Sequence, residues 1–399
     1  MSTAEVNISQ NFKMTKLEKK IHKQFITKFE RESILIQSPG RVNLIGEHTD
    51  YNDGFVLPAA IDKTIVLAIS PNNLTKIRAY SVDMEESEEF EIDNLHESNK
   101  HWAKYIKGAV SEVQKEGHHP RGFDVVFGGD IPIGAGLSSS AALEGAVLVG
   151  MEELFGFGLS RSEMAKIGQR TEHNHVGVKC GIMDQFINLH GQENKVLKLD
   201  CRSLDYELFP FERDDIKIVL CNSKVSHNLA DSEYNVRRAQ CEKGMEILKK
   251  YKPEIQNLRD VHMELLQVHK DEMSEVVFRR CKYVLEENQR VHDACNDLKK
   301  NDFEAFGKRM FQSHEGLRQD YEVSCKELDV LVDIARDQPG LLGSRMMGGG
   351  FGGCTINLVE EEQVDSFTET IRKKYKDKVG KETEIYVTQI SSGAKVLER

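Results

Sequence analysis

Charged and polar side chains crowd into residues 38–53, whose sequence is SPGRVNLIGEHTDYND. The side chains that could do chemistry there are Arg41, Glu47, His48, Asp50 and Asp53. Carboxylates, an imidazole and a guanidinium this close together offer acceptors and donors for the hydroxyls of a polyhydroxylated ligand. A metal site is the alternative, but the segment lacks the histidine spacing of a zinc-binding helix. We therefore expect a sugar-like ligand and call these residues the sugar segment.

A second segment, residues 134–143, reads GAGLSSSAAL and leads into an amphipathic helix. Glycines let backbone amides converge, serines add hydroxyl donors, and a helix start contributes positive potential. These properties suit a polyphosphate group, although the chain has no G-x-x-x-x-G-K-[ST] motif. An ordinary turn that caps a helix remains the alternative for this segment alone. The candidate phosphate loop comprises Gly134, Ala135, Gly136, Leu137, Ser138, Ser139 and Ser140.

A third segment, residues 343–353, reads GSRMMGGGFGG. Gly348, Gly350 and Gly353 match G-x-G-x-x-G, which binds dinucleotides only where a strand precedes it and a helix follows. Here the following CTINLV reads as a strand, so the dinucleotide interpretation fails. We expect a structural loop that packs against the candidate phosphate loop.

The elements around these segments follow from hydrophobic periodicity. Helices are predicted at 13–30, 141–155 and 160–176, and strands at 64–70 and 122–127. The acidic residues 85–93 predict a solvated loop or sheet edge. A strongly helical stretch at 235–337 precedes a β-α-β end at 354–359, 360–375 and 384–390. This order predicts an α+β protein of two lobes, residues 1–205 and 206–399, with a ligand cleft between them.

Composition narrows the function classes. A formal charge of −11 argues against a protein that wraps nucleic acid. No stretch of about 18 apolar residues occurs, so we expect no membrane-spanning helix, and the polar N-terminus does not resemble a signal peptide. The eight cysteines form no C-x-x-C pair, which favours reduced thiols and a cytoplasmic protein.

Four motifs in order carry a family resemblance: PGRVNLIGEHTDYN, GAGLSSSAAL, CGIMDQF at 180–186 and GSRMMGGGFGGC. Together they resemble the galactokinase branch of the GHMP small-molecule kinases, from about residue 38 to the C-terminal GAKVLER. The resemblance implies ATP- and Mg²⁺-dependent phosphorylation of D-galactose at its anomeric 1-hydroxyl, the first committed step of galactose catabolism. It also implies a two-lobed GHMP fold. The N-terminal lobe would contain a left-handed βαβ crossover, and the C-terminal lobe would be a ferredoxin-like α/β unit with added helices.

The resemblance also assigns residues. Asp184 and Arg41 match the catalytic pair, with Asp184 facing the sugar hydroxyl either as general base or as an orienting acceptor. Ser140 and Glu172 match the magnesium ligands, and Trp102 in HWAKYIKG matches a segment that stacks on adenine. The loop at 134–140 matches the ATP phosphate site. Sugar-contacting positions match Arg41, Glu47, His48, Asp50, Gly181, Asp184 and Tyr234. We expect a monomer whose partners are these small molecules.

Met347 departs from the family pattern, which has threonine before the glycines. The change either removes a hydroxyl near the phosphates or is absorbed by local repacking. Two other functions are compatible with the resemblance. One is an N-acetylgalactosamine kinase, although Thr49, Asn52 and Cys180 follow the galactokinase pattern. The other is a non-catalytic sensor of sugar and ATP, whose fungal examples carry a deletion in the serine-rich loop that is absent here.

Overall fold

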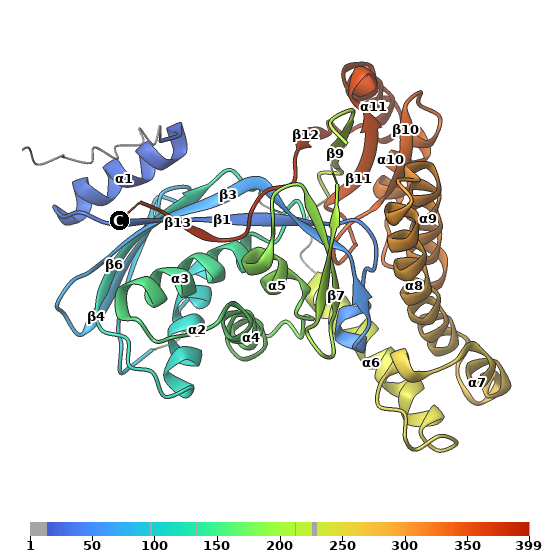
Figure 1. Cartoon of the computed structure of the whole chain (residues 1–399), viewed down its shortest axis with the longest axis horizontal. Helices are drawn as coiled ribbons and strands as arrows, with labels where there is room; N and C mark the ends of the chain where they lie inside the picture. Colours follow the sequence, from blue (N-terminus) through green and yellow to red (C-terminus); the bar gives the residue numbers. More distant parts are fainter. Residues whose placement is uncertain (1–13, 96–97, 133, 212, 226–229, 399) are drawn as a thin grey trace, which may run out of the picture.

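The computed structural model of the chain describes residues 14–95, 98–132, 134–211, 213–225 and 230–398. Figure 1 shows two lobes, one built on a long sheet and one flanked by long helices. The helices are α1 Lys16–Phe29, α2 His101–Lys115, α3 Ser139–Phe155, α4 Arg161–Thr171, α5 Met183–His190, α6 Ala230–Leu248, α7 Met263–Val268, α8 Glu275–Lys299, α9 Phe303–Glu315, α10 Lys326–Arg336 and α11 Val364–Val379. Among the described residues, no helix is long and apolar enough to cross a bilayer.

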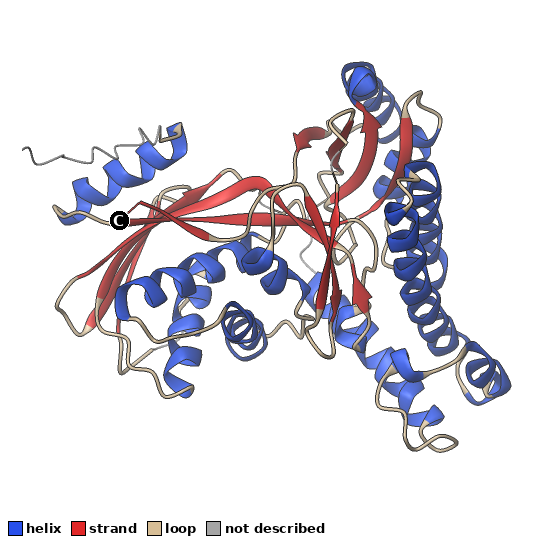
Figure 2. Cartoon of the chain, in the orientation of Figure 1, coloured by secondary structure: helices blue, strands red, loops and turns tan. Residues whose placement is uncertain are grey.

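Three sheets organise the strands, in the orders β13-β1-β3-β6-β4-β5, β10-β11-β9-β12 and β2-β7-β8. The strands are β1 Ile34–Asn43, β2 Phe55–Val56, β3 Pro58–Pro71, β4 Lys76–Ser81, β5 Glu86–Glu91, β6 Phe123–Gly129, β7 Lys195–Asp200, β8 Tyr206–Pro210, β9 Ile216–Asn222, β10 Leu341–Met346, β11 Cys354–Glu360, β12 Glu384–Thr388 and β13 Lys395–Glu398. The mixture of helices and sheets in two lobes confirms the predicted class (Figure 2).

The middle of β3, in the six-stranded sheet, is buried on both faces, which explains the apolar run IVLAI at 65–69. Side chains alternate across a strand, so Val66 and Ala68 contact α1 while Leu67 and Ile69 face the larger core. Figure 1 shows α1 on one side of this sheet and α2, α3, α4 and α5 on the other. The helix predicted at 13–30 is α1, which begins at Lys16 after the N-cap Thr15 and ends at Phe29 before the C-cap Glu30; residue 13 lies outside the described residues.

The predicted crossover connects two neighbouring strands of this sheet. β4 and β6 pair in parallel, and the chain between them forms β5 and α2. The handedness of this connection stays a prediction. β5 holds the acidic residues at the edge of the sheet, which confirms the edge predicted for them.

The C-terminal lobe has ferredoxin-like connectivity, since its sheet is built from a βαββαβ unit of β9, α10, β10, β11, α11 and β12. The added helices α6 to α9 are inserted between β9 and α10. In Figure 1 they form an elongated arm beside the sheet.

The chain then returns to the first lobe, which the sequence analysis missed. β13 pairs with β1 in antiparallel fashion, with Gln37 opposite Lys395. β13 has only four residues, which is too short for its alternation of side chains to give a clear strand signal. β8, just beyond residue 205, likewise pairs with β7. The predicted division near residue 205 did not anticipate either contact, and as a domain boundary it stays a prediction.

Candidate active site

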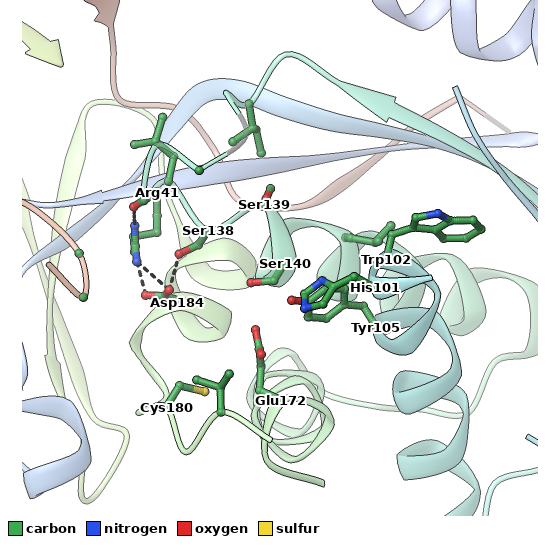
Figure 3. A pocket seen from close by; sticks show the side chains of 18 of the residues that line it. Arg41, His101, Trp102, Tyr105, Ser138, Ser139, Ser140, Glu172, Cys180 and Asp184 are labelled. Atoms are coloured by element: carbon green, nitrogen blue, oxygen red, sulfur yellow. Dashed lines mark hydrogen bonds and ion pairs between the residues drawn. The ribbon is translucent and has the colours of Figure 1, made fainter. Parts of the chain in front are cut away.

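A cavity of about 730 Å³ is lined by residues of both lobes. Its wall combines the sugar segment, the candidate phosphate loop, the start of α5 and the third glycine-rich loop. Figure 3 shows it from close by. The predicted site residues that line it are Arg41, Glu47, His48, Asp50, Trp102, Gly134, Gly136, Leu137, Ser138, Ser139, Ser140, Glu172, Gly181, Asp184 and Tyr234.

Ala135 is the predicted site residue that the structure does not bring to this wall. Its side chain is fully buried in the core of the first lobe. Its backbone amide donates to the Pro132 carbonyl at 3.3 Å. Ala135 therefore lies in the candidate phosphate loop with its side chain away from the cavity, and its assignment to the ATP site stays a prediction.

Arg41 and Asp184 form a two-bond ion pair on the cavity wall. Arg41 Nε donates to Asp184 Oδ1 and Nη2 to Asp184 Oδ2, each at 2.7 Å. Arg41 Nη1 also donates to the Gly136 carbonyl at 2.5 Å. Burial acts to lower the pKa of Arg41, but the Asp184 carboxylate outweighs it and the pKa is raised. The pair therefore joins β1, α5 and the candidate phosphate loop at one point.

Ser138 adds a third partner to this carboxylate. Its hydroxyl donates to Asp184 Oδ2, as the dashed lines of Figure 3 show. Ser138 can reach α5 because its backbone is left-handed, with φ of 55°, between Gly136 and the first residue of α3. Sequence reasoning gave Ser138 only a phosphate-loop role, since the contact crosses 46 residues.

Glu47 connects the sugar segment to the third glycine-rich loop. Its Oε1 accepts hydrogen bonds from Arg345 Nη2 and from the Gly348 amide, both at 2.8 Å. Arg345 is completely buried and also donates to the carbonyls of Asn43 and Leu44. Sequence analysis assigned Arg345 no role, because nothing in the sequence separates a buried arginine from an exposed one.

Gly181 fits closely against Asp50. A Cβ atom at Gly181 would lie 2.0 Å from the Asp50 carboxylate, so only glycine allows this approach. The Tyr51 amide donates to Asp50 Oδ1 at 3.0 Å. Burial, together with the neighbouring Asp184, raises the pKa of Asp50 to about 7.

The raised pKa of Asp50 predicts a pH-dependent stability. Between about pH 4 and 7 the folded chain binds a proton at Asp50 that the unfolded chain releases, so its contribution falls as the pH rises through this range. Asp50→Asn mimics the protonated side chain and removes this term. We expect the free energy of unfolding of Asp50→Asn, relative to that of the unsubstituted chain, to increase from pH 4 to 7. Urea titrations measure it, and a constant difference would contradict the raised pKa.

Ser140 and Glu172 point into the same part of the cavity in Figure 3. The helix predicted at 160–176 ends at Thr171, and residues Glu172–Val176 form a π-helical turn that carries Glu172. Such turns often occur at functional sites. Within the described part of the chain, no cluster of three or more His, Cys, Asp or Glu side chains could hold a metal.

Trp102 lies at the opposite end of the cavity. Its indole Nε1 donates to Glu86 Oε2 at 2.8 Å and its ring packs on Phe127. Sequence analysis missed Ser81 and Met84 there, because the hairpin between β4 and β5 carries no motif. It also gave no role to His101 and Tyr105, although both stand near Trp102 in HWAKYIKG.

Met347 is 1% exposed and packs in the hydrophobic cluster that the two lobes share, although it also borders the cavity. The side chain therefore has apolar neighbours, as the second of the two alternatives for it, local repacking, requires. Its consequence for activity stays a prediction.

Comparison with known proteins shows which family the chain belongs to. The galactokinase galactose-binding signature matches residues 23–71, and the GHMP kinase N- and C-terminal domains match 104–192 and 296–377. Galactokinase of Clostridium perfringens (strain 13 / Type A) is 42% identical over 92% of this chain and 97% of its own. The chain belongs to the galactokinase family. The Bos taurus galactokinase is 41% identical over 95% of this chain and 96% of its own.

Solved structures agree with this galactokinase assignment. The galactokinase of Lactococcus lactis, crystallised with galactose, superposes with a TM-score of 0.91 at 35% identity, over 94% of this chain and 99% of that one. The mevalonate kinase of Methanococcus jannaschii has a TM-score of 0.63 at 20% identity, over 90% and 99% of the two chains. The latter likeness shows the fold alone.

Proposed function

We propose that the chain is an ATP-dependent galactokinase that forms galactose 1-phosphate and ADP. One observation carries the proposal: the Asp184 carboxylate, held by Arg41 and Ser138, lies in one cavity with both the sugar segment and the glycine-serine loop. The galactose bound by the related Lactococcus lactis enzyme supports the choice of sugar.

In the proposed reaction, Asp184 accepts a hydrogen bond from the anomeric hydroxyl of galactose and takes up its proton. The sugar oxygen forms a bond to the γ-phosphorus of ATP while the bond to the β,γ-bridging oxygen breaks, and ADP leaves. Phosphoryl transfer asks the protein mainly for positioning and charge neutralisation. Arg41 holds the carboxylate in place, and the loop at 134–140 supplies amides and hydroxyls for the phosphates.

Mg²⁺ is the proposed metal, with Ser140 and Glu172 as its protein ligands. A hydroxyl and a carboxylate are the hard oxygen donors that this ion accepts, and one or two protein ligands with phosphate oxygens are its usual environment at kinase sites. Both side chains line the cavity beside the glycine-serine loop. When bound with ATP, the ion would neutralise charge on the phosphate oxygens.

Six further residues complete the proposed site. Trp102 is proposed to lie beside adenine. The proposed sugar contacts are Glu47, His48, Asp50, Gly181 and Tyr234. We also propose a cytoplasmic monomer. All eight cysteines are free thiols, which supports a reducing compartment. The molar mass of the protein in solution, compared with the 45.4 kDa of one chain, tests whether it is a monomer.

ADP release with different sugars tests the proposal. We expect kcat/KM for D-galactose to exceed that for D-glucose by at least about 100-fold, because an epimer leaves buried polar groups of the site without partners. Comparable rates for the two sugars would overturn the assignment. A preference for N-acetylgalactosamine would indicate the related kinase. Binding of galactose and ATP without ADP release would indicate a sensor.

A further inference from the structure

Two tyrosines behind the sugar segment do not line the cavity and have no assigned role. Tyr51 follows Asp50 in the segment itself, and Tyr321 follows the π-helical turn after α9 in the other lobe. Their hydroxyl oxygens are 2.6 Å apart. Tyr321 is completely buried, and Cys241 of α6 lies 3.3 Å from its hydroxyl. A chain of polar atoms therefore links the helical arm to His48.

The direction of each hydrogen bond in this series, from Cys241 to His48, follows from the contact at its His48 end. His48 Nε2 lies 3.2 Å from the Gly349 carbonyl, which can only accept, so Nε2 carries a proton. In a neutral imidazole the other nitrogen then accepts, and Tyr51 must donate to Nδ1 across 2.9 Å. That uses the only hydroxyl proton of Tyr51, so its oxygen accepts from Tyr321. The Tyr321 oxygen in turn accepts from the Cys241 thiol.

The charge states of the two ends agree with this direction. Burial, with smaller effects of Arg237 and Arg345, lowers the pKa of His48 to about 3, and its ring is neutral at pH 7. Burial raises the pKa of Cys241 to about 11, so the thiol keeps the proton that it donates.

The same tyrosines hold the parts of the site that recognise sugar. The backbone amide of Tyr51 binds the Asp50 carboxylate, and its hydroxyl binds His48. The Tyr321 carbonyl accepts from Arg237 Nε at 2.9 Å. Two residues further on, Val323 accepts from the Phe351 amide of the third glycine-rich loop at 2.6 Å. Residues 321–323 therefore contact the sugar segment, α6 and the glycine-rich loop together.

We propose that Tyr51 and Tyr321 are positioning residues for galactose binding. Their hydroxyls, with the Cys241 thiol, form a one-way chain of hydrogen bonds that fixes His48 as its Nε2–H tautomer and holds the sugar segment against the C-terminal lobe. The inference rests on the proposed function for its ligand, but the tautomer itself does not depend on it. A ligand hydroxyl that accepts a hydrogen bond from His48 Nε2 must replace the Gly349 carbonyl as the acceptor.

The tautomer is measured directly in the free protein. Ring ¹⁵N spectra of histidine-labelled chain, with the His48 signals identified by their loss in His48→Gln, should show a neutral Nε2–H ring from about pH 5 to 8. In Tyr51→Phe the donor to Nδ1 is gone, and a mixture of the two tautomers is expected. An Nδ1–H ring or an imidazolium at pH 7 in the unsubstituted chain would overturn the proposal.

Galactose affinity measures the consequence. In Tyr321→Phe and Tyr51→Phe we expect the calorimetric Kd for galactose to rise about fivefold, the effect of one lost buried hydrogen bond, with the Kd for ATP within about twofold. Tyr375→Phe is the matched control, because its buried hydroxyl, on α11, donates to the Ser223 carbonyl at 2.7 Å and does not line the cavity. It should leave the galactose Kd unchanged.

Wild-type galactose affinity in both variants, with unaltered His48 ring signals, would contradict the positioning role. If Tyr321→Phe does not fold, Tyr51→Phe and the spectrum of the unsubstituted chain still decide. A chain that binds no galactose at all contradicts the proposed function instead, and the ring spectrum then tests the hydrogen-bond chain by itself.

Discussion

Asp184→Asn is expected to lower kcat for galactose phosphorylation by about 10²–10⁴-fold, the range for loss of a general base. An amide can still accept a hydrogen bond through its one oxygen, but it cannot take up the proton of the anomeric hydroxyl. ATP binding should persist, because its proposed contacts lie on the loop at 134–140. Coupled ADP release measures turnover, and calorimetry measures ATP binding. Near-normal turnover would refute the proposed role of Asp184.

The chain offers a matched control for this substitution. Asp124 also accepts two hydrogen bonds from an arginine, Arg78, at 2.7 and 2.6 Å, and Arg31 lies 3.6 Å from its Oδ2. It is completely buried and does not line the cavity. Asp124→Asn should lower the melting temperature while leaving kcat within about twofold. The comparison separates loss of an arginine–carboxylate pair, which both variants suffer, from loss of the proton acceptor.

Arg345→Met should destabilise the folded chain by about 3–5 kcal/mol, the cost of leaving one partner of a buried ion pair alone. The substitution removes the hydrogen-bond donor of the Asn43 and Leu44 carbonyls. It also removes one of the two donors to Glu47 Oε1, so that the buried carboxylate oxygen keeps the Gly348 amide but loses the guanidinium. Urea titration with far-UV circular dichroism measures the free energy of unfolding. A loss below about 1 kcal/mol would show that water or a rearranged side chain replaces the guanidinium.

A second substitution tests the cause of that loss. Glu47→Gln added to Arg345→Met removes the unpaired charge but not the cavity or the orphaned carbonyls. The double variant should be more stable than Arg345→Met, because an uncharged amide costs less to bury than a carboxylate. If both variants are equally unstable, the lost contacts with Asn43 and Leu44 account for the effect. An exposed pair such as Arg213 with Asp215 supplies the control, and Arg213→Met should change stability little.

Features that depend on neighbouring residues could be predicted from the sequence. The candidate phosphate loop, the sugar segment and the strand after the third glycine-rich loop were all predicted from local spacing. The structure has the strand and brings both segments to the cavity wall, while the ligand contacts of the two segments stay predictions. The contact between Arg41 and Asp184 crosses 143 residues, and the family resemblance, not periodicity, indicated it.

Features that depend on burial could not be predicted. Tyr321 stands outside every motif, and the glycine pattern around Arg345 assigns that side chain no role, yet each becomes a fully buried contact to the sugar segment once the lobes meet. The position of β13 is also set by tertiary contacts, because its four residues become a strand by pairing with the edge of β1. Such contacts are set by the tertiary packing of distant segments, for which local patterns contain no signal.

The return of β13 bears on how the first lobe is completed during synthesis. β1 leaves the ribosome with the first strands of the chain, whereas β13 follows every other strand. Until β13 arrives, one edge of β1 presents unpaired amides and carbonyls, the kind of edge at which chains associate. The lobe that contributes Arg41 to the cavity is therefore closed by residues made long after it, and until then the edge of β1 is open to pairing with other chains.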